Sequence, residues 1–399
     1  MADHQVDILI IGGGLIGATL MHALAPTGLR CMLVDNHPLP QRFEADFDAR
    51  SVALSAASVR IFNHLHLWSL IEPKASRIDK IHVSEQGRFG TAYFESPHEE
   101  PLGHVVDTQM LMHALYHSLD PNTLWMPASV IAFDAQKRVA TIQKGGQHHR
   151  VQARLFVAAD GSNSIMRSLC HLSAEVKDYG QHAVVANIGL ARAHQHVAYE
   201  RFTASGPMAL LPLGPKRMSL VWSLVPEEAQ RFMAMSEAVF LESLTKAFGY
   251  RLGRFLQLGR RVIYPLQQMI MPEQTQGSVV FIGNAAHTLH PVAGQGFNLG
   301  LRDVAMLAQS ITKKGLEDET LLDQYQQARQ FDQAVITRFT DFLINVYTNK
   351  GRGVALSRQL GLLALDTHPF LKQLLSRYAS GLGGYAPDLV CGIPLAECL

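Results

Sequence analysis

A glycine-rich turn between a buried strand and a helix is the feature that most restricts how this chain can fold. Residues 12–17 read GGGLIG and match the spacing GxGxxG, directly after the apolar run VDILII at residues 6–11. Gly12 permits a tight turn, Gly14 lets the backbone approach a pyrophosphate, and Gly17 lets helix and strand pack closely. The helix that follows presents free N–H groups and its positive dipole end to the phosphates. The pattern predicts a dinucleotide-binding βαβ start.

An acidic residue completes this first unit. A second strand is expected over residues 30–35 (RCMLVD), and it ends at Asp35. A carboxylate there can accept hydrogen bonds from both ribose hydroxyls of an adenosine. The apolar run is not a signal peptide or an anchor, because acidic Asp3 and Asp7 stand where a signal peptide has basic residues.

A second stretch, LFVAADGSNSIMR at residues 155–167, reads as a strand that delivers Asp160-Gly161 at a turn. Ser162 or Ser164 can cap the helix that follows. An ordinary strand–turn–helix corner explains this stretch equally well when it is taken alone.

The third stretch, residues 281–303, reads FIGNAAHTLHPVAGQGFNLGLRD. A buried strand ends at Gly283, Asn284 can then point toward a ligand, and Pro291 fixes a bend. Backbone N–H groups at the helix start suit a negatively charged acceptor such as a reduced flavin. The glycines around that start are Gly294, Gly296 and Gly300, and they surround Asn298.

Periodicity elsewhere predicts a mixed fold. We expect helices at 50–70, 107–119, 236–248, 296–313 and from 319 to about 380, and strands at 80–95, 125–157, 181–224 and 278–283. The apolar clusters at 339–347 and 360–375 pack in a core by default, or else face lipid or a partner.

Charge and cysteine content exclude several function classes. A net charge of +1 gives no basic field, so nucleic acid is not an expected partner. Four cysteines without CxxC spacing indicate a reducing compartment rather than a disulfide framework. No further run is apolar enough to cross a bilayer, so we expect a cytoplasmic protein, or one peripheral at the inner face of a membrane.

Together the three stretches resemble the class A flavoprotein monooxygenases, whose type member is para-hydroxybenzoate hydroxylase, over residues 5–310. Within that class, HPVAGQGFNLGLRD and DARSVALSAAS (48–58) are similar to the ubiquinone-biosynthesis hydroxylases. The resemblance implies an α/β fold in which a Rossmann-like FAD-binding domain is interleaved with an antiparallel-sheet substrate domain and followed by C-terminal helices. The implied ranges are 1–75, 100–180 and 275–315 for FAD binding, 76–99 and 181–274 for the substrate domain, and 316–399 for the C-terminal helical region.

The resemblance also implies the cofactor-binding residues. They are Gly12, Gly14, Leu15, Gly17 and Asp35 for the ADP half, Arg50 near the flavin, Asp160 in the Asp-Gly role, Asn284 at the ribityl chain, and Gly294, Gln295, Gly296, Phe297 and Asn298 around the isoalloxazine. Most of the class has Gly-Asp where this chain has Gly283-Asn284. The 2-polyprenyl-6-methoxyphenol hydroxylase branch resembles this chain in having Asn there.

The reaction implied is hydroxylation of a polyprenylated phenol in ubiquinone biosynthesis through a flavin C4a-hydroperoxide, with FAD, O₂ and NAD(P)H or another electron donor. No catalytic side chain is certain, and His290 and Pro291 are the candidates. His287 and His290 lack a third ligand, so we expect no metal site. Arg302 and Asp303 are expected to brace the helix, or to form a weak surface pair.

Implied partners are the polyprenylphenol, other quinone-biosynthesis proteins and a membrane surface. Two alternatives stay open. One is another flavin oxidoreductase of this fold, such as a small-aromatic hydroxylase or a prenyl reductase. The other is a non-catalytic assembly protein that retains the fold.

Overall fold

A parallel sheet forms around the N-terminal strand β1 (His4–Ile11), whose last four side chains are buried. The computed structural model describes residues 2–39, 46–95, 100–348, 352–368, 372, 380–382, 386–393 and 395. Around β1 the parallel strands are β2 (Cys31–Val34), β8 (Leu124–Trp125), β11 (Gln147–Ala158) and β19 (Val279–Phe281), in the order β19-β11-β1-β2-β8. Antiparallel strands extend this sheet: β18 (Thr275–Gln276) beside β19, and β10 (Val139–Lys144) with β9 (Ser129–Asp134) beside β11.

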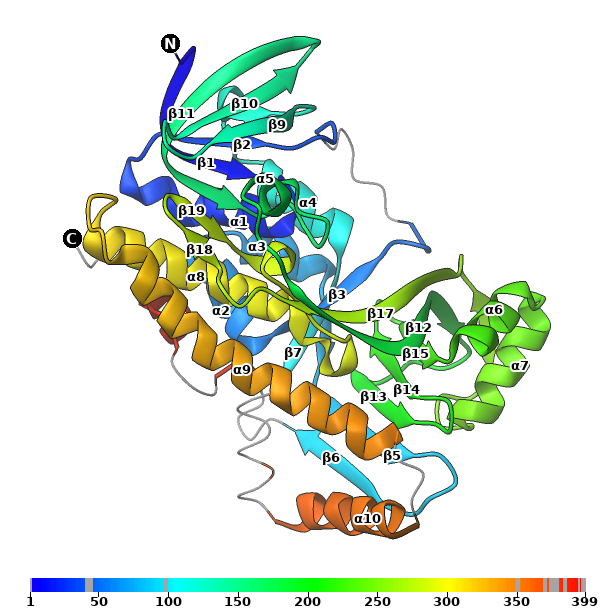
Figure 1. The fold of residues 1–399 in the computed structure, drawn as a ribbon. Helices are drawn as coiled ribbons and strands as arrows, with labels where there is room; N and C mark the ends of the chain where they lie inside the picture. Colours follow the sequence, from blue (N-terminus) through cyan, green and yellow to red (C-terminus); the bar gives the residue numbers. More distant parts are fainter. Residues whose placement is uncertain are drawn as a thin grey trace.

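Helices cover both faces of this sheet, as expected for buried parallel strands. On one face α1 (Leu15–Leu24), α4 (Thr108–Tyr116) and α8 (Gln295–Lys314) share a core with the sheet, and α5 (Ile165–Leu169) packs on the other face (Figure 1). The helices predicted for 107–119 and 296–313 are confirmed, as are the first βαβ unit and the strand at 278–283. Local glycine punctuation and apolar periodicity are sufficient for these elements.

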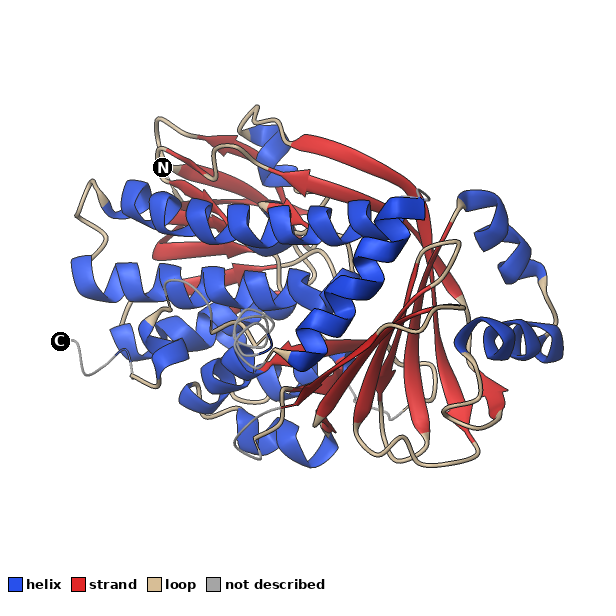
Figure 2. Ribbon diagram, turned by 90° about the horizontal axis from the view of Figure 1, so that it is seen from below, coloured by secondary structure: helices blue, strands red, loops and turns tan. Residues whose placement is uncertain are grey.

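A second, larger sheet forms the other end of the molecule (Figures 1 and 2). Its order is β20 (His287–Thr288), β17 (Val262–Ile270), β12 (Glu175–Leu190), β15 (Arg217–Leu224), β14 (Pro207–Pro212), β13 (Val197–Phe202), β5 (Lys80–Glu85), β6 (Thr91–Glu95), with β16 (Phe255–Leu258) also paired to β12. All pairs are antiparallel except β13 with β5. Helices α6 (Pro226–Ala234) and α7 (Glu237–Phe248) cover one face and enclose a separate apolar core.

A small third sheet corrects the sequence analysis. The segment predicted as a helix over 50–70 begins with strand β3 (Ser51–Ser55), and α2 (Ala56–His64) and α3 (Trp68–Ile71) follow. Strand β3 pairs antiparallel with β7 (Gly103–Asp107), which also pairs with β4 (Ser76–Ile78). Pairing with a distant strand outweighs the near-helical spacing of the apolar residues, and the helix starts only where the Ser55 hydroxyl accepts a hydrogen bond from Ser58 N (3.3 Å).

Long helices follow α8. Helix α9 (Leu321–Thr348) extends from beside α8 toward the second sheet, and α10 (Arg352–Thr367) lies beside β6 (Figure 1). Short elements complete the described fold: α12 (Asp388–Cys391) and the 3₁₀ turns η1 (Ala25–Thr27), η2 (Glu72–Lys74), η3 (Pro121–Thr123), η4 (Gly283–Ala285) and η5 (Val292–Gly294). Among the helices that the structure describes, none has the length and hydropathy needed to span a bilayer.

Candidate functional site

The first glycine turn lies directly against the Asp-Gly turn. A Cβ added to Gly12 would stand 2.3 Å from the Ala159 carbonyl oxygen, and one added to Gly17 would stand 1.9 Å from the Gly12 carbonyl oxygen. Gly12 also has a φ of +107°, which L side chains rarely adopt. Strand, turn and helix therefore meet with no room for side chains at these two positions.

The third stretch packs on the same turn. The side chain of Ile16 lies between Gly283 and Gly300, where added Cβ atoms would stand 3.0 Å and 2.8 Å from its carbons. Gly283 adopts a φ of +58° as β19 turns into η4. The two glycine clusters, far apart in the chain, are therefore adjacent in space.

Other glycines border a large cavity instead of packing. Gly14, Gly161 and Gly296 line a cavity of about 920 Å³, and a Cβ at any of them would have no atom within 4 Å. These bare backbone segments come from all three stretches. A ligand in the cavity could therefore approach the peptide groups of each one.

Hydrogen bonds fix the first turn from two sides. Asp35 accepts from Gly13 N (2.6 Å) and from His37 N (2.7 Å), and the Tyr116 hydroxyl donates to the Gly13 carbonyl oxygen (2.6 Å). An ionised carboxylate has about four acceptor positions. Asp35 therefore holds the glycine turn in place and still has lone pairs that could accept a hydrogen bond from a ribose hydroxyl. Its contact with the ribose stays a prediction.

Asp160 keeps an unused acceptor. Its Oδ2 accepts from Met166 N (3.1 Å), whereas its Oδ1 is buried and has no hydrogen-bond partner in the described part of the chain. Burial raises the pKa of this carboxyl, although hydrogen bonds from Ser164 and the following backbone act in the opposite direction. Ser164 is confirmed as the helix cap, since it accepts from Arg167 N (3.0 Å). A buried oxygen without a partner is costly unless a ligand satisfies it.

Asn284 stands exposed on η4 and lines the cavity. Behind it, Gly283 N donates to Asp303 Oδ2 (2.9 Å), which also lies 2.6 Å from His287 Nε2. Arg329 Nε donates to Asp303 Oδ1 (2.7 Å). Burial alone would raise the pKa of Asp303, but His287 and Arg329 outweigh it and hold that pKa well below the usual range. A buried charge network thus holds the turn in place.

This network corrects one expectation. Arg302 and Asp303 do not brace α8 as a pair with one another, and neither is a surface residue. Arg302 pairs with Asp332, and Asp303 pairs with Arg329, so both bonds reach α9. Adjacent residues on a helix point in directions about 100° apart, so the partners come from another element.

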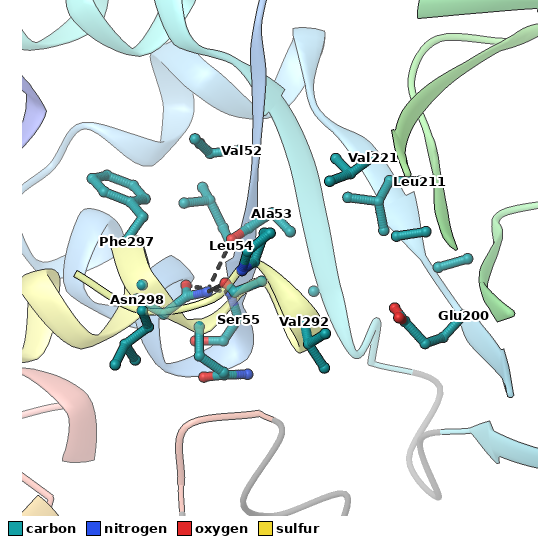
Figure 3. Close-up of a pocket in the computed structure, with 18 of the residues that line it drawn as sticks. Val52, Ala53, Leu54, Ser55, Glu200, Leu211, Val221, Val292, Phe297 and Asn298 are labelled. Atoms are coloured by element: carbon teal, nitrogen blue, oxygen red, sulfur yellow. Dashed lines mark hydrogen bonds between the residues drawn. The ribbon is translucent and has the colours of Figure 1, made fainter. Parts of the chain in front are cut away.

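Asn298 connects α8 to strand β3. Its side-chain oxygen accepts from Ser55 N (2.8 Å) and Ser58 Oγ (2.7 Å), and its amide donates to the carbonyl oxygens of Ala53 (3.0 Å) and Gly294 (2.8 Å) (Figure 3). The side chain is therefore fully used within the protein. Asn298 positions the helix start and β3, and leaves ligand contact to backbone groups.

The cavity continues from the glycine turns to the second sheet. Its far wall is apolar and consists of Ile81, Val83, Ala198, Phe202, Ala209, Leu211 and Val221, with Phe339, Phe342, Leu362 and Leu365 from α9 and α10. Leu15, Gln295, Phe297, Pro291 and Thr288 line it nearer the turns. One end is thus backbone-rich and polar, and the other suits an apolar ligand.

Glu200 is the one carboxylate among the described residues that line this cavity. Burial raises its pKa to about 7. Glu200 was not among the residues predicted from the sequence. Residues two apart in a strand share a face, so Glu200 lies on the same face of β13 as the apolar residues Ala198 and Phe202. A lone carboxylate on an apolar strand face was the sequence feature that could have identified it.

Gly12, Gly17, Asp35 and Asp160 lie next to the cavity but do not line it, and two further predicted site residues lie outside its wall. Arg50 is exposed, and its guanidinium carbon lies 5.0 Å from the centre of the Tyr264 ring. His290 is buried behind the wall, where its Nδ1 accepts from Val292 N (3.2 Å) and burial lowers its pKa to about 4. Pro291, the other catalytic candidate, lines the cavity. Across the described ranges, no three His, Cys, Asp or Glu side chains are grouped to hold a metal ion.

Comparison with known sequences gives matches along nearly the whole chain. The family model described as "FAD binding domain" matches residues 5–340. Ubiquinone hydroxylase UbiL of Rhodospirillum rubrum is 34% identical over 99% of this chain and 94% of that protein. The 3-demethoxyubiquinol 3-hydroxylase of Escherichia coli is 30% identical, with coverage of 96% and 100%.

Solved structures give the same fold. The p-nitrophenol 4-monooxygenase PnpA from Pseudomonas putida superimposes with a TM-score of 0.79 at 15% identity, covering 96% of this chain and 99% of that one. PqsL from Pseudomonas aeruginosa, in complex with 2-aminobenzoylacetate, gives 0.74 at 22% identity, covering 90% and 100%. The para-hydroxybenzoate hydroxylase-like fold expected from the resemblance is confirmed.

Proposed function

This chain belongs to the family that the FAD binding domain model describes, and from that membership we propose that it is an FAD-dependent monooxygenase that hydroxylates a polyprenylated phenol in ubiquinone biosynthesis. The observation that carries the proposal is the cavity of about 920 Å³, which joins three glycine turns to an apolar sheet face. Relatives named as ubiquinone hydroxylases match this chain from end to end. Such a reaction needs O₂ and a reduced donor, NAD(P)H or another.

The described residues fit FAD. The bare backbone at Gly14 and Gly296 borders open space, and Asp160 Oδ1 is a buried acceptor without a partner. The α1 N-terminus would hold the pyrophosphate, with Asp35 at the adenosine ribose. Asp160 and Asn284 would receive hydroxyl groups of the ribityl chain. When bound, FAD supplies the activation of oxygen.

The helix start at residues 294–298 would face the redox-active ring. Its backbone N–H groups and dipole stabilise negative charge, which suits a reduced flavin. Asn298 and Asp303 hold this segment in place from behind through their hydrogen bonds to β3 and η4. The protein's own contribution is thus orientation and exclusion of water by the apolar wall.

The apolar end of the cavity would receive a prenyl chain. Helix α10 contributes Leu362 and Leu365 to the wall, whereas Leu356, Leu360 and Leu363 on its other side are exposed to solvent. We propose that these exposed leucines contact the membrane from which a polyprenylated substrate arrives. Flotation with phosphatidylethanolamine–phosphatidylglycerol vesicles should recover the protein, and Leu356→Ser with Leu360→Ser should abolish recovery; equal recovery would refute this contact.

The decisive experiment is mass spectrometry of quinone precursors in cells with and without the protein. Its loss should cause a polyprenylphenol lacking one hydroxyl to accumulate, because the next ring substituent needs that oxygen. Purified protein should be yellow and should convert the same compound only when O₂ and a reductant are present. Unchanged quinone levels would contradict the substrate, and a colourless protein that ignores added FAD would favour an assembly role.

A further inference from the structure

Glu200 occupies an unusual place in the second sheet. Along β13, Ala198, Glu200 and Phe202 line the cavity on one face of the strand. Tyr199 also borders the cavity, and its ring packs against Phe248. Glu200 pairs in register with Val83 of β5 and Ala209 of β14, both of which also line the cavity. The carboxyl is thus surrounded by apolar side chains from its own strand and from both neighbours.

Among the residues that the structure describes, none balances the charge of this carboxyl. In the described structure Glu200 has no hydrogen bond, and no ion pair joins it to a lysine, arginine or histidine. Figure 3 shows its oxygens turned into the cavity, toward the side on which Val292 and Asn298 lie. Glu200 is half-buried, and a carboxylate in apolar surroundings is stabilised when a ligand donates a hydrogen bond to it. A role in folding therefore does not explain Glu200, whereas a ligand that donates a hydrogen bond does.

We propose that Glu200 binds the ring hydroxyl of the phenolic substrate and thereby sets which ring carbon faces the flavin. A phenol O–H is a strong donor and a carboxylate is a strong acceptor, and their hydrogen bond is strongest in an apolar, water-poor site. The prenyl chain would then lie along the apolar wall, where it has no competing polar contact. This inference rests on the proposed function, because it assumes that a phenol occupies the cavity.

The pH dependence of phenol binding should follow this one carboxyl. The side chains that face Glu200 from β5, β14, β15 and α9 are apolar, including Val83, Leu211, Val221 and Phe339. Arg201 lies on the opposite face, where its Nε donates to the Ala247 carbonyl oxygen (3.0 Å). Tyr199 borders the cavity with its ring against Phe248, and burial raises the pKa of its hydroxyl. With a pKa near 7, the acceptor form of Glu200 gains population as the pH rises from 6 to 8.

The test uses the FAD-loaded protein and two probes, 2-(3-methylbut-2-enyl)phenol and its methyl ether. The ether keeps the shape but has no O–H. Binding is followed through the change in flavin absorbance. The wild-type protein should bind the phenol at least tenfold more tightly than the ether, because a site built for a hydroxyl rejects an analogue that lacks it. Phenol binding should also strengthen from pH 6 to pH 8.

Two variants and one control separate the outcomes. Glu200→Leu should bind phenol and ether equally, and Glu200→Gln should lose the pH dependence while it keeps FAD. Glu242→Gln, on the exposed face of α7 where Glu242 pairs with Lys246 (2.6 Å), should match the wild type. If Glu200→Leu retains the preference for phenol, the inference fails while the proposed function stands. If the wild type binds neither probe, both fail.

Discussion

Replacing Gly14 with valine should separate FAD binding from folding. Gly14 is the N-cap of α1 with φ −68° and ψ −175°, which is extended backbone that valine adopts readily. A Cβ at this position meets no atom within 4 Å, so the protein itself has room for the side chain. Because valine is a poorer N-cap residue than glycine, stability should fall by about 1 kcal/mol at most.

The effect on FAD should be much larger. The valine carbons would occupy the part of the cavity where we place the pyrophosphate. Forcing extra methyl groups into a filled site costs about 1–3 kcal/mol. Losing one hydrogen bond from backbone N–H to a charged phosphate costs about 1.5–3 kcal/mol more. A combined loss of about 3 kcal/mol or more corresponds to over 100-fold weaker binding.

The assay titrates flavin-depleted protein with FAD and follows the quenching of flavin fluorescence, alongside a thermal melt. Gly361→Val is the matched control, because Gly361 is exposed on α10 and also has open space around its Cβ. Gly17→Ala is the opposite case, since its Cβ would stand 1.9 Å from the Gly12 carbonyl oxygen and the fold itself should fail. Should Gly14→Val bind FAD within threefold of the wild type, the pyrophosphate does not pass over Gly14 and the reasoning is wrong.

Three further outcomes follow from buried polar groups. Asn298→Ala removes four hydrogen bonds and should lower the free energy of unfolding by about 2–4 kcal/mol. The variant should also release FAD on gel filtration. Full retention of FAD would contradict the role of Asn298 in positioning the helix start. Asp303→Asn should cost about 3–5 kcal/mol in urea unfolding, because Arg302 and Arg329 would then share only the Asp332 carboxylate, whereas Glu319→Gln at an exposed position should change little. Burial lowers the pKa of His104 and His290 to about 4. Between pH 6.5 and 4 the unfolded chain therefore binds more protons than the folded protein. The free energy of unfolding should fall by roughly 1.4 kcal/mol per pH unit for each histidine as the pH drops through this range. A urea midpoint that is constant from pH 7 to 5 would refute this.

The elements that carry the glycine stretches were predictable because their signals are local. Strand β1 is a continuous apolar run, and the turn at Gly12–Gly17 needs glycine for contacts within a few residues of itself. Helix α8 likewise follows from its own glycines and apolar period. The resemblance assigned both clusters to one cofactor, and the structure shows that they meet at Ile16, a contact that was not predicted and that explains why Gly283 and Gly300 are glycines.

The features that escaped prediction depend on distant partners. Residues 51–55 have near-helical apolar spacing, but β7 supplies hydrogen bonds that make them a strand. The partners of Arg302 and Asp303 lie on α9, which sequence spacing alone does not place. Glu200 looks like an ordinary strand residue until the sheet assigns its face to the cavity. In each case tertiary structure decides the role of the residue.

The cavity wall draws on segments from Gly14 near the beginning of the chain to Leu365 near its end. During synthesis the first glycine turn leaves the ribosome long before the α8 helix start exists, and α10 follows later still. A partly made chain can thus offer FAD only one edge of its final surroundings. We therefore expect the flavin to be captured late in maturation. A truncation that removes α9, whose Arg329 pairs with the Asp303 carboxylate behind the Gly283 turn, should yield colourless protein even though every glycine turn is present.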